Sequence, residues 1–270
     1  MSDILNLVIS YDFIWRAFVA GLMISVCASL LGVTIVLKRL SMIGDGLSHI
    51  SFGAIAIASA LGIAPLKLAI PLAAISAVIL FTMSGKKIKG DSGIALISSA
   101  ALAIGIIVIS YRGSSADMNN YLVGSLYSVT KSDLFVALVL CVLVILSFIF
   151  LYNKIFAVTF DEDFAHVSGA KSSIYSTLLA VLTSVVVVVG MRLMGALLIS
   201  SLIVFPALSA MRIFKSFLKV TLCSLVFSLI SFLVGFMLTL ILDSVPTGAC
   251  ITAVNFVIFI LSCLVSEFKK

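Results

Sequence analysis

An aspartate and a histidine four positions apart are the sequence's clearest candidate for binding chemistry. Asp45 and His49 belong to the run GDGLSH at 44–49, at the start of an apolar segment. On a helix, residues four apart share one face and their side chains can meet. Carboxylate oxygens and imidazole nitrogens are both ligands for zinc and its neighbours. The spacing predicts a two-residue cation site; the alternative is an aspartate that caps the helix and a histidine that only packs.

The surroundings of this pair favour a functional role if the segment crosses a membrane. An ionised side chain at the membrane centre costs about 2.5–3.5 kcal/mol on the milder insertion scale, and such residues usually face a cavity or a pathway. The flanking Gly44 and Gly46 would let another backbone approach closely or break the helix.

The composition indicates an all-α, polytopic membrane protein. Hydrophobic residues make up 63% of the chain and charged residues 10%, against about 45–50% and about 25% in a soluble domain. A membrane span needs about 20 mostly apolar residues. We expect one transmembrane domain over 1–270 with eight or nine spans, the second and third being short or closely joined. The candidate spans are 13–37, 43–63, 66–84, 92–110, 134–152, 174–191, 193–211, 220–242 and 248–266.

The basic residues predict the orientation of these spans. Most of the 17 lysines and arginines fall in the C-terminal tail and the loops at 38–42, 85–91, 153–173 and 212–219. Lys and Arg accumulate in cytoplasmic loops, so these loops and the C-terminus should be cytoplasmic. The same pattern accounts for the net charge of +6 without a nucleic-acid partner. The polar segment 112–133 is expected to dip into the outer leaflet.

The longest cytoplasmic loop contains a candidate short helix at about 161–171. The stretch from Asp161 to Ala170 starts with acidic residues and has Gly169 near its end, which suits the two termini of a helix. His166, beside Asp161, Glu162 and Asp163, is either a solvated loop residue or part of a metal site.

Two further residues lie where a gate would be possible. Arg192 falls at a tight junction between two spans and is either an interfacial anchor or a pathway residue. Pro206 removes a helix hydrogen bond and can kink its span, which would shape a gate or serve packing alone. The five cysteines are scattered without a CxxC pair, as expected of small buried hydrophobic residues.

Two missing motifs exclude an ATP-binding P-loop and an HExxH zinc protease, but they do not decide the function. The chain has no GxxxxGK[ST] sequence with which to cradle ATP and no HExxH sequence of a zinc protease. Three classes stay open on these grounds: a transport subunit, an intramembrane enzyme using Asp45 as acid or base, and an ion channel.

Five segments, in order along the chain, resemble permeases of zinc and manganese ABC importers. The run at 190–207 is most similar to the zinc branch. The segments are KRLSMIGDGLSH at 38–49, NYLVGSL at 120–126 followed by SDL at 132–134, FDEDFA at 160–165 followed by Gly169, GMRLMGALLI at 190–199 followed by FPA at 205–207, and PTGA at 246–249.

This resemblance implies a type II ABC-importer permease in a prokaryotic plasma membrane, related to cobalamin and siderophore importer permeases. It implies a homodimer, two cytoplasmic ATPase subunits that hydrolyse the ATP, and an extracellular metal-binding protein. Zinc, or else manganese or iron, would pass as substrate, with no permanently bound cofactor. Asp45 and His49 match the family's metal-pathway pair. The residues matching its ATPase-coupling helix are Asp161, Glu162, Asp163, Phe164, Ala165 and Gly169.

Overall fold

The protein is an all-α structure in the part of the chain that the computed structural model describes. That part comprises residues 11–83, 90–112, 129–162, 165, 171–242 and 245–268. It contains nine long helices and no strand. In chain order they are α2 (Asp12–Leu37), α3 (Ile43–Ala60), α4 (Pro65–Met83), α5 (Gly90–Arg112), α7 (Lys131–Phe160), α9 (Ser172–Met194), α10 (Ala196–Ile213), α11 (Phe217–Ile241) and α12 (Thr247–Phe268).

Eight of these helices are long and apolar enough to cross a membrane, which confirms the predicted fold class. The ninth, α3, carries Asp45 and His49 and is not among the eight. Most of α3 is nevertheless buried, because it packs against α4, α5, α9 and α10. The helix that carries Asp45 and His49 is therefore largely enclosed by other helices.

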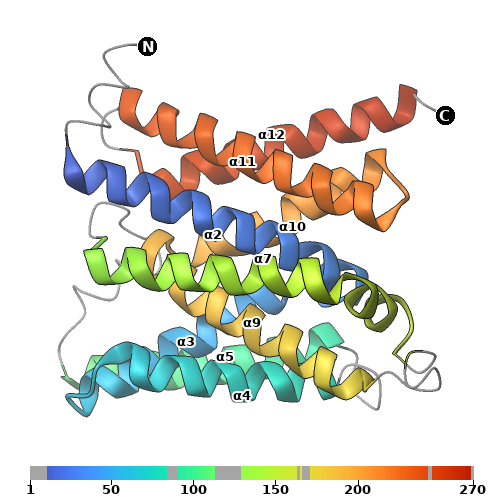
Figure 1. Ribbon diagram of the computed structural model, residues 1–270. Coiled ribbons are helices and arrows are strands. Elements are labelled where there is room, and N and C mark those ends of the chain that lie inside the picture. Colours follow the sequence, from blue (N-terminus) through green and yellow to red (C-terminus); the bar gives the residue numbers. More distant parts are fainter. Residues whose placement is uncertain are drawn as a thin grey trace.

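The helices form two groups (Figure 1). One contains α2, α7, α10, α11 and α12, and the other contains α3, α4 and α5. Helix α9 lies between them and contacts α2, α7 and α10 on one side and α3 and α4 on the other. The turn at 38–42 carries the chain from the first group to the second.

The backbones of α3 and α5 approach closely at two glycines, Gly53 and Gly105. A Cβ atom at Gly53 would lie 2.5 Å from the carbonyl oxygen of Ala101, and one at Gly105 would lie 2.9 Å from the Cα of Gly53. Real Cβ atoms do not come this close, so the two backbones meet at a distance that larger residues would prevent. This contact fixes the side of α3 that α5 covers.

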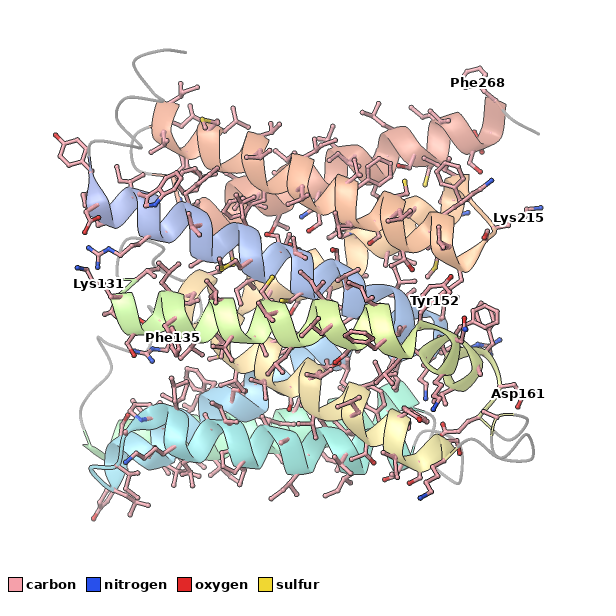
Figure 2. All side chains as sticks on the ribbon, in the orientation of Figure 1. Lys131, Phe135, Tyr152, Asp161, Lys215 and Phe268 are labelled. Atoms are coloured by element: carbon pink, nitrogen blue, oxygen red, sulfur yellow. The ribbon has the colours of Figure 1, made fainter. Side chains whose placement is uncertain are left out.

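The described residues of the basic loops at 38–42, 153–173 and 212–219 lie at one end of the molecule. Asp161, Lys215 and Phe268 lie at this end, and Lys131 lies at the other (Figure 2). Among the described residues, the first end also holds the 38–42 turn, the end of α7 and the start of α9 (Figure 1).

One predicted boundary was wrong. We expected the span at 134–152 to end in a loop, but α7 continues to Phe160. Ile155 and Val158 are buried against the core, and Phe160 packs edge-on against Phe217 of α11. This apolar face keeps the chain helical past the polar residues at 153 and 154. Only 161–171 separates α7 from α9.

Candidate functional site

A rigid turn sets the position of Asp45 and His49. Arg39 adopts a left-handed conformation with φ of 59° and ends α2, while the Leu40 amide donates to the carbonyl of Ile35 at 3.0 Å. Leu40 and Ile43 are fully buried and fix the turn to the core. Helix α3 then begins at Ile43.

The two site residues contact each other, as their spacing predicts. His49 Nε2 lies 3.4 Å from Asp45 Oδ2. The Asp45 side chain is 51% exposed and that of His49 26% exposed. The His49 Nδ1 atom is buried and has no hydrogen-bond partner among the residues that the structure describes. The Asp45 carboxylate is thus accessible to a ligand, whereas the unpartnered imidazole nitrogen of His49 is enclosed by protein.

The pair lies on the side of α3 between its contacts with α5 and α10. Gly44 faces α10, where its Cβ would lie 3.2 Å from Ile203 Cδ1, and Gly46 faces Ile94 of α5. Successive helical residues are about 100° apart, so Asp45 points between these two contacts. His49, one turn later, follows the same direction. The nearest neighbours of both glycines are isoleucine side chains, and α3 continues through them, so neither glycine breaks the helix.

One copy of the chain offers two protein ligands here. Over the described ranges, no group of three or more His, Cys, Asp or Glu side chains is close enough to hold a metal ion. A tetrahedral zinc site takes four ligands. A cation at this pair would therefore need further ligands from water or from a second molecule.

Arg192 makes an ion pair that the sequence did not reveal. Its Nη1 lies 3.1 Å from Oδ1 of Asp133, whose side chain is 10% exposed. The other oxygen, Oδ2, accepts hydrogen bonds from the amide and hydroxyl of Thr130, at 3.1 and 2.7 Å. Arg192 thus joins the end of α9 to the capped start of α7. This contact supports its interpretation as an anchor, and the predicted tight junction after it is the single residue Gly195.

Pro206 lies in the middle of α10 and is buried. Next to it, Phe205 packs edge-on against Phe256 and Phe259 of α12. Both the packing role and the gating role predicted for Pro206 are compatible with this position.

The predicted coupling segment is described only in part. Asp161 ends α7, and its carbonyl accepts a hydrogen bond from the Ala165 amide at 3.1 Å, which closes one helical turn. Glu162 pairs with Lys38. The remaining residues predicted for this segment, and the candidate metal ligand near it, lie outside the described residues: Asp163, Phe164, His166 and Gly169.

Comparison with known proteins assigns the family. The model of the ABC 3 transport family matches residues 10–266, nearly the whole chain. This protein belongs to the ABC 3 transport family.

Other members of the ABC 3 family are similar over almost their full length. The manganese transport system membrane protein MntC of Halalkalibacterium halodurans is 28% identical over 94% of this chain and 87% of its own. The high-affinity zinc uptake system membrane protein ZnuB of Buchnera aphidicola is 27% identical over 96% of this chain and 98% of its own. Among solved structures, PsaBC from Streptococcus pneumoniae in complex with Fab has a TM-score of 0.84 and 26% identity, over 97% of this chain and 94% of that one.

The family that the five motifs predict is thereby confirmed. The names of the relatives divide between manganese and zinc, so the preference for zinc stays a prediction. Membership of a transport family agrees with the prediction of a transport subunit.

Proposed function

We propose that this ABC 3 protein is the permease of an ATP-driven importer that carries a divalent transition metal across the plasma membrane. The observation that carries the proposal is the Asp45–His49 pair, partly exposed on the side of α3 between α5 and α10, on a helix that is otherwise largely enclosed. Manganese and zinc transport relatives that align over almost the whole chain support the choice of substrate class.

In this proposal the pathway lies between two copies of the chain. Each copy contributes one carboxylate and one imidazole, and two copies supply the four ligands of a tetrahedral zinc ion. The pair replaces part of the hydration shell of the metal as the metal passes. The exposed carboxylate allows water to exchange at the site, which keeps retention transient.

Two kinds of partner complete the importer. An extracellular binding protein delivers the metal at the end where α7 begins. Two ATPase subunits bind at the opposite end, where the segment at about 161–171 docks into them. ATP-driven closure of the ATPases displaces this segment and opens the inner side of the pathway.

Zinc is the metal we propose first, because imidazole and carboxylate are ligands it takes readily. Manganese and iron are the alternatives, since geometry and availability often decide between metals that share a ligand set. Uptake of radioactive zinc in the presence of an equal concentration of manganese or iron distinguishes them. Strong inhibition of uptake by manganese at equal concentration would contradict a zinc-selective pathway.

The test of the proposal is metal uptake by variants that still insert and assemble. Mutation of a residue that only hydrogen-bonds a metal ligand already lowers metal affinity or activity by about 10–100-fold. We therefore expect Asp45→Asn and His49→Ala, which change the ligands themselves, each to reduce uptake at least about tenfold. Asp12→Asn is the matched control, because Asp12 also forms an i,i+4 pair, 3.5 Å from Arg16, and is 76% exposed. Normal uptake by both site variants would refute the pathway role.

A further inference from the structure

Lys38 is a nearly buried cation at the end of the molecule where α2 ends. Its side chain is 10% exposed. The ammonium nitrogen lies 3.2 Å from Glu162 Oε2, donates to Ser176 Oγ at 3.1 Å, and lies 5.8 Å from the ring centroid of Phe81. These partners come from the segment after α7, from α9 and from α4. One side chain therefore contacts three separate elements.

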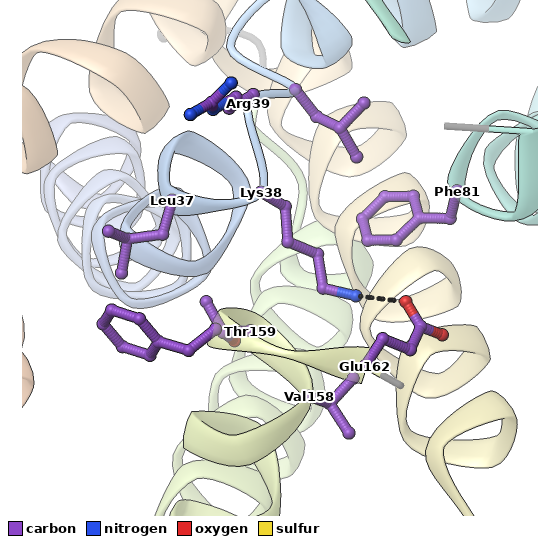
Figure 3. Close-up of a pocket in the computed structure, with 9 residues that line it drawn as sticks. Leu37, Lys38, Arg39, Phe81, Val158, Thr159 and Glu162 are labelled. Carbon is purple, nitrogen blue, oxygen red and sulfur yellow. Dashed lines mark hydrogen bonds and ion pairs between the residues drawn. The ribbon is translucent and has the colours of Figure 1, made fainter. Parts of the chain in front are cut away.

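A cavity of about 250 Å³ surrounds this lysine. Figure 3 shows Lys38 extending from the end of α2 between Phe81 and Thr159 to reach Glu162. The walls come from 37–40, from α4, and from the last residues of α7. The space around the ion pair leaves room for Glu162 to move relative to the turn, which tight packing would not allow.

The chain between Lys38 and Asp45 is stiff. The amide of Lys38 donates to Thr34, that of Ile43 donates to Leu40, and Leu40 itself is 1% exposed. These hydrogen bonds and the buried Leu40 connect the end of α2 to the first turn of α3, although Arg39 and Met42 of the turn are exposed. Movement of the Lys38 side chain is thus passed to the turn that positions the site.

The charge makes this connection strong. Removing the partner of a buried ion leaves an uncompensated charge, which is strongly unfavourable. The Glu162 side chain is 45% exposed, so it is free to follow a partner bound outside. When Glu162 moves, the Lys38 ammonium group must move with it or lose its ion pair and keep only the hydrogen bond to Ser176 and the contact with Phe81.

We propose that Lys38 is a positioning residue that carries movement of the segment after α7 to the 38–42 turn, and so to Asp45 and His49. The inference rests on the proposed function and adds a route from the ATPase to the metal site. The lysine touches neither the metal nor the ATPase.

The test measures metal uptake and ATP hydrolysis in the same proteoliposomes, with the permease assembled with its ATPase and with zinc or manganese as the probe. We expect Lys38→Met to lower the metal carried per ATP hydrolysed by about fivefold or more, the usual lower range for coupling between sites. Hydrolysis itself should continue. Lys38→Arg should retain most of the coupling, because it keeps the charge.

Glu162→Gln provides a second variant that leaves the buried lysine in place, should Lys38→Met fail to assemble. The double variant should be no worse than Lys38→Met alone, since the two residues act as one unit. Lys154→Met is the matched control, because Lys154 of α7 donates to the Tyr175 hydroxyl of α9 at 2.7 Å, a bond that does not involve the 38–42 turn. It should leave the coupling unchanged.

Two results would overturn the inference. One is an unchanged ratio of uptake to hydrolysis in both single variants. The other is a parallel loss of uptake and hydrolysis in proportion to the amount of assembled complex, which marks a purely structural role. If the wild-type complex carries no metal, the proposed function is refuted instead. The wild-type arm of the same experiment measures this.

Discussion

At the scale of residues, three polar pairs occupy different positions and serve different purposes. The Asp45 carboxylate is half-exposed, and it lies beside a partly buried His49 whose Nδ1 atom has no partner among the described residues. The other two pairs, Lys38–Glu162 and Asp133–Arg192, each have one nearly buried member with additional hydrogen bonds. A buried ion pair whose hydrogen bonds are satisfied holds two helices in one relative position, whereas an exposed charged group is available to bind a ligand.

The Asp133 carboxylate should contribute measurably to stability, because it caps α7 and binds Arg192. Loss of a helix cap costs about 0.5–2 kcal/mol, so Asp133→Ala should destabilise the protein by about 1–2 kcal/mol or more. Thr130→Ala removes the N-cap hydroxyl and its two hydrogen bonds with Asp133 but leaves the ion pair, so it should cost less. Denaturant unfolding in detergent measures both, and equal stability of Asp133→Ala and the wild type would contradict this role.

The candidate metal site could be predicted as a contacting pair, but the direction in which the pair points could not be predicted. The contact of Asp45 with His49 follows from their spacing alone. The direction of the pair depends on α5 and α10, which approach α3 from distant parts of the sequence. Likewise, the ion pair of Lys38 spans 124 positions, and neither residue's neighbours in sequence indicate its partner.

At the scale of elements, sequence patterns located the helices well because their lengths follow membrane thickness. The exception is α7, where the buried face of the residues around Ile155 extends the helix beyond the apolar run. Hydropathy indicates which residues lie in lipid, whereas residues 153–160 of α7 stay helical because they contact other helices. Such contacts are invisible in one sequence.

The contact of α3 with α5 predicts a sensitive position at Gly53. Gly53→Ala would press a methyl group against the Ala101 carbonyl, and overpacking typically costs about 1–3 kcal/mol. Ala103→Leu, on the exposed side of α5, adds more atoms and should cost little. Thermal unfolding in detergent compares the two; a Gly53→Ala protein as stable as the wild type would show that α5 can shift freely.

At the scale of the whole molecule, the distribution of basic residues predicts which end faces the cytoplasm. Lys131 and Lys215 lie at opposite ends (Figure 2). A membrane-impermeant thiol reagent should label Lys131→Cys in intact cells and Lys215→Cys only after permeabilisation. The wild-type chain is the control, since three of its cysteines are buried and two partly buried. Labelling of Lys215→Cys in intact cells would reverse the proposed topology.

The most direct test of the metal pathway is zinc X-ray absorption spectroscopy on the purified importer complex. We expect nitrogen and oxygen ligands at about 2.0–2.2 Å and no sulfur at about 2.3 Å. The imidazole signal should disappear in His49→Ala and persist in the Asp12→Asn control. Sulfur ligation, or an imidazole signal unchanged in His49→Ala, would contradict a zinc site built by Asp45 and His49.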